Sequence, residues 1–285
     1  MSLECRAIIN YHQITKSPNH NIDKYLIMSN ISIQITGNIA TITFERAEKF
    51  NSFIRSMALD FQAALDQASK DDNVRCVVIT GNGKAFCAGQ DLYEATDPNG
   101  PPLTKIVSEH FNPIISRIRN LPKPVIAAVN GVAAGAGANI ALSCDIVVAT
   151  ESASFIQAFS KIGLIPDSGG TYTLPRLIGF QRASALMMMG DKIGAKHAQE
   201  IGMIYKTYPD DLFNEEVIKL ANQLANMPTY GLALTKEALN KTFSNTLEEQ
   251  LLLEDKLQTL AGDSEDYKEG TSAFLQKRQP LFRGK

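Results

Sequence analysis

A run of twenty residues without a charge, VIAAVNGVAAGAGANIALSC at 125–144, does most to narrow the folds open to this chain. Its length matches a membrane span, which needs about 20 apolar residues. The run is rich in alanine and glycine, however, and it carries polar residues such as Asn139. Pro124 precedes it, and Asn130-Gly131 is a dipeptide typical of turns. We therefore predict a buried strand, a turn and a buried helix, and no membrane association.

The segments around this run alternate between the hydrophobic periods of strands and helices. ISIQITGNIATITF at 31–44 alternates apolar and polar residues around a Gly-Asn turn, which predicts a β-hairpin. Phe53, Met57 and Phe61 begin a series at helical spacing. The order strand, strand, helix repeats about three times, which predicts an α/β fold. The predicted elements after the hairpin are a helix over 53–69, a strand over 74–80, a helix over 104–120 kinked at Pro113, a strand over 124–130, a helix over 136–143, and strands over 145–150 and 153–158.

Both ends of the chain differ from this core. Residues 1–27 are polar and contain no apolar stretch of the kind found in a signal peptide. We expect them to be a loose extension, with Met28 as an alternative start. The pattern over 28–210 is the repeated strand–strand–helix core. Beyond it, over 211–285, four helices are expected, at 212–227, 229–243, 246–262 and 266–278.

The last helices carry more apolar surface than a short tail can bury by itself. Leu247, Leu251, Leu252 and Leu257 are examples of these apolar positions. We therefore expect the region 211–285 to associate copies of the chain.

Composition excludes several classes of protein. The net charge is −2, and acidic and basic residues are interspersed without a basic stripe, so we expect no nucleic-acid partner. The four cysteines form no C-x-x-C pair, which favours reduced thiols and a cytoplasmic location over disulfides or zinc. The four histidines show no metal-ligand spacing either. We expect no metal site.

The segment GLIPDSGG at 163–170 holds one carboxylate in apolar surroundings. Two interpretations are open. Asp167 or Ser168 could cap the helix that follows by accepting hydrogen bonds from its first amides. Alternatively, Asp167 is a catalytic carboxylate held in an apolar pocket.

The glycine-rich segments allow three interpretations. A dinucleotide fingerprint over 135–140 lacks its third glycine, because Ile140 stands there. A nucleophile elbow at Ser168 would need a glycine at the position of Pro166. The third interpretation is an anion site made of two exposed backbone amides, an oxyanion hole, with AFCAGQDL at 85–92 as its second loop.

Three segments, 81–92, 123–150 and 159–179, resemble the enoyl-CoA hydratase/isomerase (crotonase) family. The resemblance covers about residues 30 to 285, and GTSAFLQKRQPLF at 270–282 is similar to the family's C-terminal signature. FCAGQDL, NGVAAGAGA and AFSKIGLIPD are most similar to members that isomerise ring-1,2-epoxyphenylacetyl-CoA. The resemblance implies a crotonase-like spiral of ββα units with a C-terminal helical region that builds homotrimers, often paired into hexamers. It also implies an acyl-CoA substrate.

The resemblance further implies roles for individual residues. The backbone amides of Gln90 and Ala136 would form the oxyanion hole around the thioester carbonyl oxygen. The Gln90 side chain could then be an ordinary core or surface group, and Lys49 could be an ordinary solvated lysine. The residues that the resemblance places near coenzyme A or the acyl group are Lys49, Ser52, Ala85, Phe86, Ala88, Gly89, Asp91, Leu92, Phe159 and Pro166.

The acidic residues decide between branches of the family. Hydratases use two glutamates, and Asn139 and Phe159 stand in their places here. At Asp167, isomerases of the family and the 4-chlorobenzoyl-CoA dehalogenase also carry aspartate. The dehalogenase adds a histidine and a tryptophan, which Asn112 and Phe159 replace here. A single desolvated aspartate of raised pKa suits proton transfer between two carbons.

The resemblance therefore implies a CoA-thioester isomerase with Asp167 as its proton shuttle. The expected substrate is ring-1,2-epoxyphenylacetyl-CoA, with Δ3-to-Δ2 shifts in enoyl-CoAs as a second activity. Coenzyme A would enter as part of the substrate, and no other cofactor is expected. An enoyl-CoA hydratase is the enzymatic alternative, and a non-catalytic RNA-binding or scaffolding member is the alternative from another class.

Overall fold

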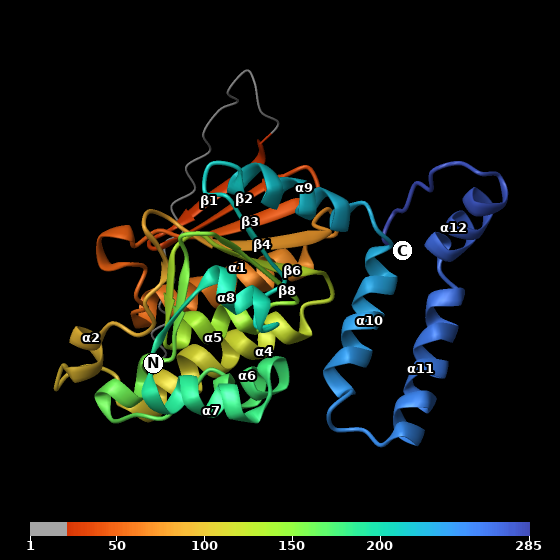
Figure 1. Ribbon diagram of the computed structural model, residues 1–285. Helices are drawn as coiled ribbons and strands as arrows, with labels where there is room; N and C mark the ends of the chain where they lie inside the picture. The colour runs from red at the N-terminus through yellow and green to blue at the C-terminus, as the bar shows by residue number, and fades with distance from the viewer. Residues whose placement is uncertain (1–21) are drawn as a thin grey trace, which may run out of the picture.

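The computed structural model describes residues 22–285, which form two β-sheets flanked by helices (Figure 1). Strand β1 (Ile22–Met28) pairs antiparallel with β2 (Ile31–Thr36). The expectation of a loose extension is therefore wrong for residues 22–27, because this segment supplies the strand that pairs with the outer edge of β2. The rest of that expectation concerns residues 1–21, which lie outside the described residues.

The larger sheet has seven strands in the order β1-β2-β3-β4-β6-β8-β11. The predicted hairpin is confirmed as β2 and β3, which pair antiparallel from Ile31 opposite Phe44 to Thr36 opposite Ile39. From β3 onward all neighbours are parallel. The remaining strands of this sheet are β3 (Ile39–Phe44), β4 (Cys76–Gly81), β6 (Val125–Val129), β8 (Ile146–Thr150) and β11 (Lys206–Tyr208).

The smaller sheet has four strands in the order β10-β9-β7-β5. They are β5 (Ala85–Cys87), β7 (Val132–Ala134), β9 (Ser154–Ile156) and β10 (Lys192–Gly194). Each consecutive pair, β4 with β5, β6 with β7 and β8 with β9, sends its first strand to the large sheet and its second to the small sheet. The predicted strand–strand–helix repeat is confirmed, and the fold is α/β.

The helices that follow the strands pack mainly on one side of the large sheet (Figure 1). The predicted helix over 104–120 has an irregular start, a π-helical turn over Ile106–Phe111 directly before Pro113. A proline cannot donate a hydrogen bond to the preceding turn, which explains the irregularity there. The helices of the core are α1 (Arg55–Lys70), α2 (Leu92–Thr96), α3 (Leu103–Lys105), α4 (Asn112–Asn120), α5 (Ala136–Leu142), α6 (Gly170–Ile178), α7 (Phe180–Met189) and α8 (Ala195–Glu200).

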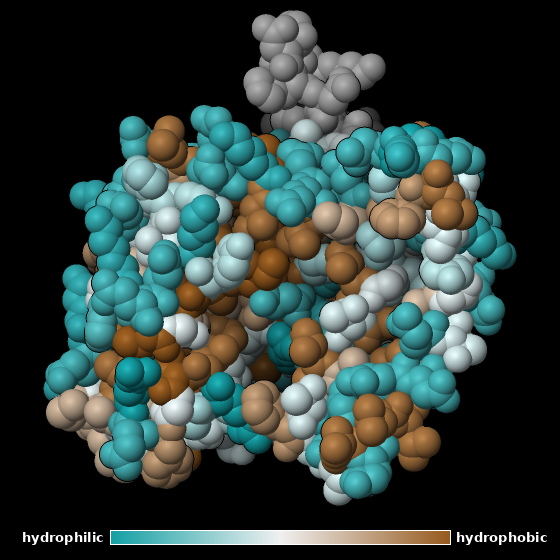
Figure 2. All heavy atoms as spheres, turned by 45° about the vertical axis from the view of Figure 1, so that its right-hand side comes forward, coloured by the Kyte–Doolittle hydropathy of each residue, from teal (hydrophilic) through white to brown (hydrophobic). Residues whose placement is uncertain are grey.

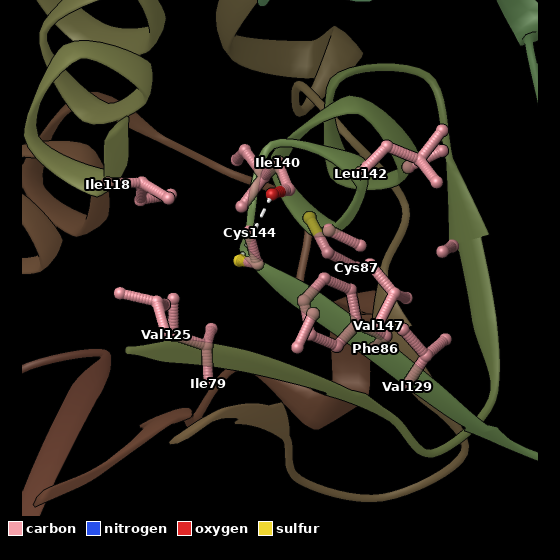
Figure 3. Close-up of a cluster of buried hydrophobic side chains, with 14 of the residues drawn as sticks. Ile79, Phe86, Cys87, Ile118, Val125, Val129, Ile140, Leu142, Cys144 and Val147 are labelled. Carbon is pink, nitrogen blue, oxygen red and sulfur yellow. Dashed lines mark hydrogen bonds between the residues drawn. The ribbon is translucent and has the colours of Figure 1, made fainter. Parts of the chain in front are cut away.

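The predicted strand and helix of the charge-free run are confirmed as β6 and α5, but the segment between them, predicted as a turn, contains the short strand β7. Figure 3 shows Ile140 and Leu142 of this run among other buried apolar side chains, including Phe86 and Cys87. Burial raises the pKa of the Cys87 thiol to about 12, so the thiol stays protonated. Among residues 22–285, no helix is long and apolar enough to cross a bilayer.

The four predicted C-terminal helices are confirmed, but they do not form one unit. Helix α9 (Phe213–Ala225) packs on the large sheet through Phe213 and Val217, against Val78 and Val148. By its packing α9 belongs to the sheet, although we placed it in the helical region 211–285. Helices α10 (Thr229–Lys241), α11 (Leu247–Gly262) and α12 (Glu265–Leu275) extend to one side of the body (Figure 1).

These last helices leave apolar side chains uncovered. Leu247, Leu251 and Leu252 are 69%, 54% and 72% exposed, as expected. Leu257 is buried, so the expectation of an uncovered side chain is wrong for this residue. Figure 2 shows hydrophobic side chains on the face that carries these helices.

Candidate active site

Three segments that carry the predicted site residues lie at one edge of the small sheet. They follow β5, β7 and β9, which are adjacent and parallel. The carboxyl ends of parallel strands meet at the same edge of a sheet, where ligands of α/β proteins commonly bind. The fold therefore brings together the loop over 88–91, the start of α5 and the loop over 163–169.

The first two segments approach each other closely at Gly89. Its φ of +90° is a conformation that favours glycine. A Cβ atom at this position would lie 3.3 Å from the Ala136 nitrogen and 3.0 Å from the Ala134 oxygen. Gly89 thus lets the loop that carries Gln90 rest against the first turn of α5.

The backbone amides of Gln90 and Ala136 are available as donors. Phe53 holds the loop from one side, since its N–H donates to the Gly89 oxygen at 2.6 Å and its oxygen accepts from the Asp91 N–H at 2.8 Å. Ala136 is the first residue of α5, where an N–H has no acceptor inside the helix. Within residues 22–285, neither the Gln90 nor the Ala136 N–H has a hydrogen-bond partner. The two amides can therefore serve a ligand oxygen.

The Gln90 side chain forms hydrogen bonds within the protein, separate from its backbone amide. Its Nε2 donates to Glu94 Oε2 at 2.9 Å, and the Glu94 carboxylate accepts from the Arg55 N–H at the start of α1. This agrees with the interpretation that the side chain is structural and that only the backbone of Gln90 faces the site.

Asp167 lies half-buried on the loop after β9. Ser168 Oγ donates to its Oδ1 at 2.8 Å, and no cationic side chain among the described residues forms an ion pair with it. Burial raises the pKa of Asp167 above its usual value, and the Ser168 hydrogen bond offsets part of that effect. The carboxylate is thus held by a hydroxyl group and, among residues 22–285, not by a cationic side chain.

The helix-capping interpretation of this aspartate is wrong. Helix α6 begins at Gly170, its N-cap is Gly169, and no side chain of the described chain accepts a capping hydrogen bond there. The backbone reaches the helix through left-handed conformations at Ser168 and Gly169, with φ of +52° and +72°. The Asp167 side chain therefore does not reach the first amides of the helix, although its backbone oxygen accepts from the Gly170 N–H at 2.8 Å.

Phe159 and Pro166 are the apolar residues predicted for the site. Phe159 is buried, and its ring lies 3.8 Å from where a Cβ atom on Gly135 would stand, beside the start of α5. Pro166 is half-buried directly before Asp167. The structure thus assembles Gln90, Ala136, Phe159, Pro166 and Asp167 around one edge.

Two of the residues expected near coenzyme A are held by Arg46. Its guanidinium forms an ion pair with Asp91 at 2.8 Å and donates to the backbone oxygen of Ser52 at 2.8 Å and to its Oγ at 3.1 Å. Asp91 also caps α2 by accepting from the Tyr93 N–H. Burial raises the pKa of Asp91, but the hydrogen bonds and charge of Arg46 outweigh this and hold it below the usual value. Ser52 and Asp91 therefore shape the loop.

The other predicted coenzyme A residues differ in exposure. Lys49 is exposed, and its Nζ lies 5.7 Å from the centre of the Tyr93 ring. Ala88 and Leu92 are exposed as well. Ala85 and Phe86 are buried. Ala85 and Phe86 could offer a ligand only their backbone, and the roles of all these residues remain predictions.

Sequence reasoning missed Arg46, and it treated Asn139 only as the replacement of a glutamate. Arg46 holds the loop by pairing with Asp91, and the two residues are 45 positions apart, so no pattern of neighbouring residues predicts the ion pair. Asn139 is 1% exposed and contacts the backbone of Asp167. Among residues 22–285, no three histidine, cysteine, aspartate or glutamate side chains are arranged to hold a metal ion.

Within residues 22–285, two backbone amides without hydrogen-bond partners and a half-buried carboxylate lie on segments that follow adjacent strands of the small sheet. Amide donors can polarise a carbonyl, and a carboxylate can move a proton from the neighbouring carbon. The fold is that of the crotonase class. The chain matches the enoyl-CoA hydratase/isomerase family over residues 34–285, and it belongs to that family.

Curated relatives and solved structures agree with this assignment. The chain is 48% identical over 262 residues to the 1,2-epoxyphenylacetyl-CoA isomerase of Escherichia coli K12, which covers 91% of this chain and 100% of the relative. It is 35% identical to the 2,3-dehydroadipyl-CoA hydratase of the same organism, over 90% of this chain and 100% of the relative. A crystal structure of an enoyl-CoA hydratase from Bacillus anthracis superposes with a TM-score of 0.84 at 34% identity, covering 90% of this chain and 100% of the other.

Proposed function

We propose that this protein is a CoA-thioester isomerase in which Asp167 moves the proton and the Gln90 and Ala136 amides hold the thioester oxygen. The observation that carries the proposal is the half-buried Asp167 carboxylate, which has no cationic partner among residues 22–285 and lies at the same edge as the two free amides. Asn139 and Phe159 stand where hydratases of the family carry glutamates, so a carboxylate pair for activating water is missing at those positions.

The proposed mechanism begins with proton removal, which places negative charge on the thioester carbonyl oxygen. The Asp167 carboxylate takes a proton from the carbon next to the thioester, and the electron pair moves to the carbonyl oxygen. The two amides stabilise this oxyanion, and each such donor is typically worth about 2.7–4 kcal/mol in the transition state. In a 3-enoyl-CoA, Asp167 then returns the proton to C4, so the double bond moves to C2–C3. The thioester acidifies its own α-carbon, so the proposal needs no metal or redox cofactor.

Ring-1,2-epoxyphenylacetyl-CoA is the proposed preferred substrate, and 3-enoyl-CoAs are second. The relative that is 48% identical is named as an isomerase of that epoxide. The buried Phe159 ring beside the start of α5 supports an apolar acyl pocket that accepts a ring. Coenzyme A would lie along the backbone around β5 and the loop after it, near Lys49.

Product analysis by mass spectrometry tests this function. Isomerisation conserves the mass of the acyl-CoA and is seen as a new chromatographic peak of the same mass, whereas hydration adds one water. Liquid chromatography coupled to mass spectrometry therefore reads both activities in one assay. We expect conversion of the ring epoxide and of 3-enoyl-CoAs, and poor hydration of crotonyl-CoA. If 3-enoyl-CoAs turn over while the epoxide is inert, the substrate assignment fails and the isomerase assignment stands. Efficient hydration without isomerisation would instead favour a hydratase, as some relatives are named.

The assembly is part of the proposal. The exposed leucines of α11, together with Phe274 and Leu275 of α12 at 83% and 80% exposure, suit contact with further copies of the chain. We expect a homotrimer or a dimer of trimers. Light scattering that gave a monomer at micromolar concentration would reject this assembly.

A further inference from the structure

Two hydrogen bonds in series connect the core to the loop of Asp167, through the side-chain amides of Gln157 and Asn139 and the backbone oxygen of Asp167. Asn139 on α5 donates from Nδ2 to the backbone oxygen of Asp167 at 2.9 Å. Its Oδ1 accepts from Gln157 Nε2 at 2.8 Å. Asn139 is 1% exposed and Gln157 is 2% exposed, so water does not compete for these contacts. The Asp167 oxygen also accepts from the Gly170 N–H at 2.8 Å.

The Asp167 backbone oxygen determines the direction of both side-chain hydrogen bonds, the one from Asn139 to Asp167 and the one from Gln157 to Asn139. A backbone carbonyl can only accept, so the Asn139 atom that faces Asp167 must be the NH₂ group. Oδ1 then faces Gln157, which must present its own NH₂ group. The Gln157 Oε1 is left buried without a partner among the described residues. A buried acceptor without a partner is destabilising, so stability alone does not explain a glutamine at this position.

The position of Asn139 along α5 relates it to the Ala136 amide. It is one helical turn after Ala136, and its N–H donates to the Gly135 oxygen at 3.2 Å. The same short helix therefore presents an oxyanion donor at its first residue and holds the Asp167 peptide from its first turn. A Cβ atom on Gly170 would overlap the Asn139 amide, which shows how closely the two segments pack.

We propose that Asn139 is a positioning residue that sets the Asp167 carboxylate relative to the Gln90 and Ala136 amides, and that Gln157 orients the Asn139 amide for this task. The inference rests on the proposed role of Asp167 as the proton shuttle. The loop turns through left-handed conformations on both residues after Asp167, so the peptide needs an anchor outside its own segment. The Asn139 amide is 1% exposed and, unlike a carboxylate, cannot take a proton from water, which favours isomerisation over hydration.

Asn139→Asp tests the proposal with a side chain of nearly the same shape. The carboxylate can still accept from Gln157 but cannot donate to the Asp167 oxygen. We expect kcat for a 3-enoyl-CoA to fall about 10-fold or more, since small misplacements of reacting groups can cost up to about 100-fold. KM should change by less than about threefold, because the oxyanion donors are backbone groups. The acid limb of the kcat/KM profile should move to higher pH, because a second carboxylate raises the pKa of Asp167.

Gln157→Met provides a second variant that does not introduce a charge. It removes the donor that orients Asn139 and also removes the unpartnered Oε1. We expect a kcat loss without a lower melting temperature, a result that a purely structural role for Gln157 does not produce. Ser143→Ala is the matched control, because Ser143 Oγ donates to the Asn139 backbone oxygen at 2.8 Å and does not reach Asp167. It should lower the melting temperature and leave kcat and the pH profile unchanged.

Comparison with Asp167→Asn distinguishes failure of the positioning role of Asn139 from failure of the proton-shuttle role of Asp167. If Asp167→Asn is inactive while Asn139→Asp and Gln157→Met keep the wild-type kcat and pH profile, the positioning role is overturned and the proton shuttle stands. If Asp167→Asn keeps the wild-type rate, both the shuttle and the positioning role are overturned.

Discussion

Two loops at the same edge of the small sheet each carry an aspartate, and their surroundings are opposite. Asp91 pairs with Arg46 at 2.8 Å, caps α2 and has a pKa below the usual value. Asp167 forms no ion pair among residues 22–285 and caps no helix, and burial raises its pKa. The same residue type is therefore paired with an arginine in one loop and, among residues 22–285, has no cationic partner in the other.

The difference shows what turns a carboxylate into a base. An arginine partner stabilises the ionised form and occupies the oxygens, so a carboxylate such as Asp91 has little tendency to take a proton. Desolvation without a cation does the reverse, and groups with such raised pKa values cluster at functional sites. The comparison makes predictions for each loop.

The largest effect is expected for Asp167→Asn. Asparagine keeps the shape but cannot take a proton, so isomerase turnover should fall about 10²-fold or more, the usual scale of general acid–base catalysis. Turnover of 3-enoyl-CoA, measured at saturating substrate, provides the test. Asp91→Asn is the matched control at the other loop and should keep most of the activity. A rate near that of the wild type for Asp167→Asn would show that this carboxylate is not the base.

Ala136→Pro should have a nearly equal effect by removing an oxyanion donor. Proline lacks the N–H but is well tolerated at the first residue of a helix, which Ala136 occupies in α5. We expect kcat to fall about 10²- to 10³-fold, as for other lost oxyanion donors. Circular dichroism and the melting temperature should show a folded protein. Unchanged turnover in the folded variant would remove this amide from the mechanism.

Asp91→Ala should mainly lower stability. The substitution removes the cap of α2 and leaves Arg46 without its carboxylate partner. Loss of a cap typically costs about 1 kcal/mol, and an unpaired buried group adds to this cost. Chemical denaturation should show a lower free energy of unfolding, while kcat at a temperature where the variant is folded stays within a few-fold of the wild type. A variant that is as stable as the wild type but inactive would reverse the assignment of the two aspartates.

The smallest effect concerns the pH dependence of stability. The pKa of Asp167 is higher in the folded than in the unfolded chain, so its contribution to stability is present at low pH and is lost as pH rises through the folded pKa. Asp167→Asn should therefore be equal to or more stable than the wild type at neutral pH. The difference in melting temperature should shrink as the pH approaches about 4, the usual pKa of aspartate. A difference that grows toward low pH would contradict the raised pKa.

Periodicity predicted the long elements and failed for the short ones. The hairpin over 31–44, the helix at 55–70 and the C-terminal helices each contain enough residues to show a period of 2 or 3.6. Strands β5 and β7 have three residues each, and we treated both segments as turns. Leu257 and Leu247 looked alike in sequence, yet one is buried and the other exposed, because burial depends on which neighbours the helix meets.

The sequence by itself determined the repeated strand–strand–helix order, the family and the candidate site residues, because these depend on local patterns and motifs. Only the tertiary structure decided that Asp91 is paired while Asp167 is not, and that Asn139 holds the Asp167 peptide. Arg46 and Asp91, and Asn139 and Asp167, are far apart along the chain, and the parallel strands bring them to a common edge. The pKa of a carboxylate depends on its solvation and on charges within a few ångströms, and those distances exist only once the chain has folded.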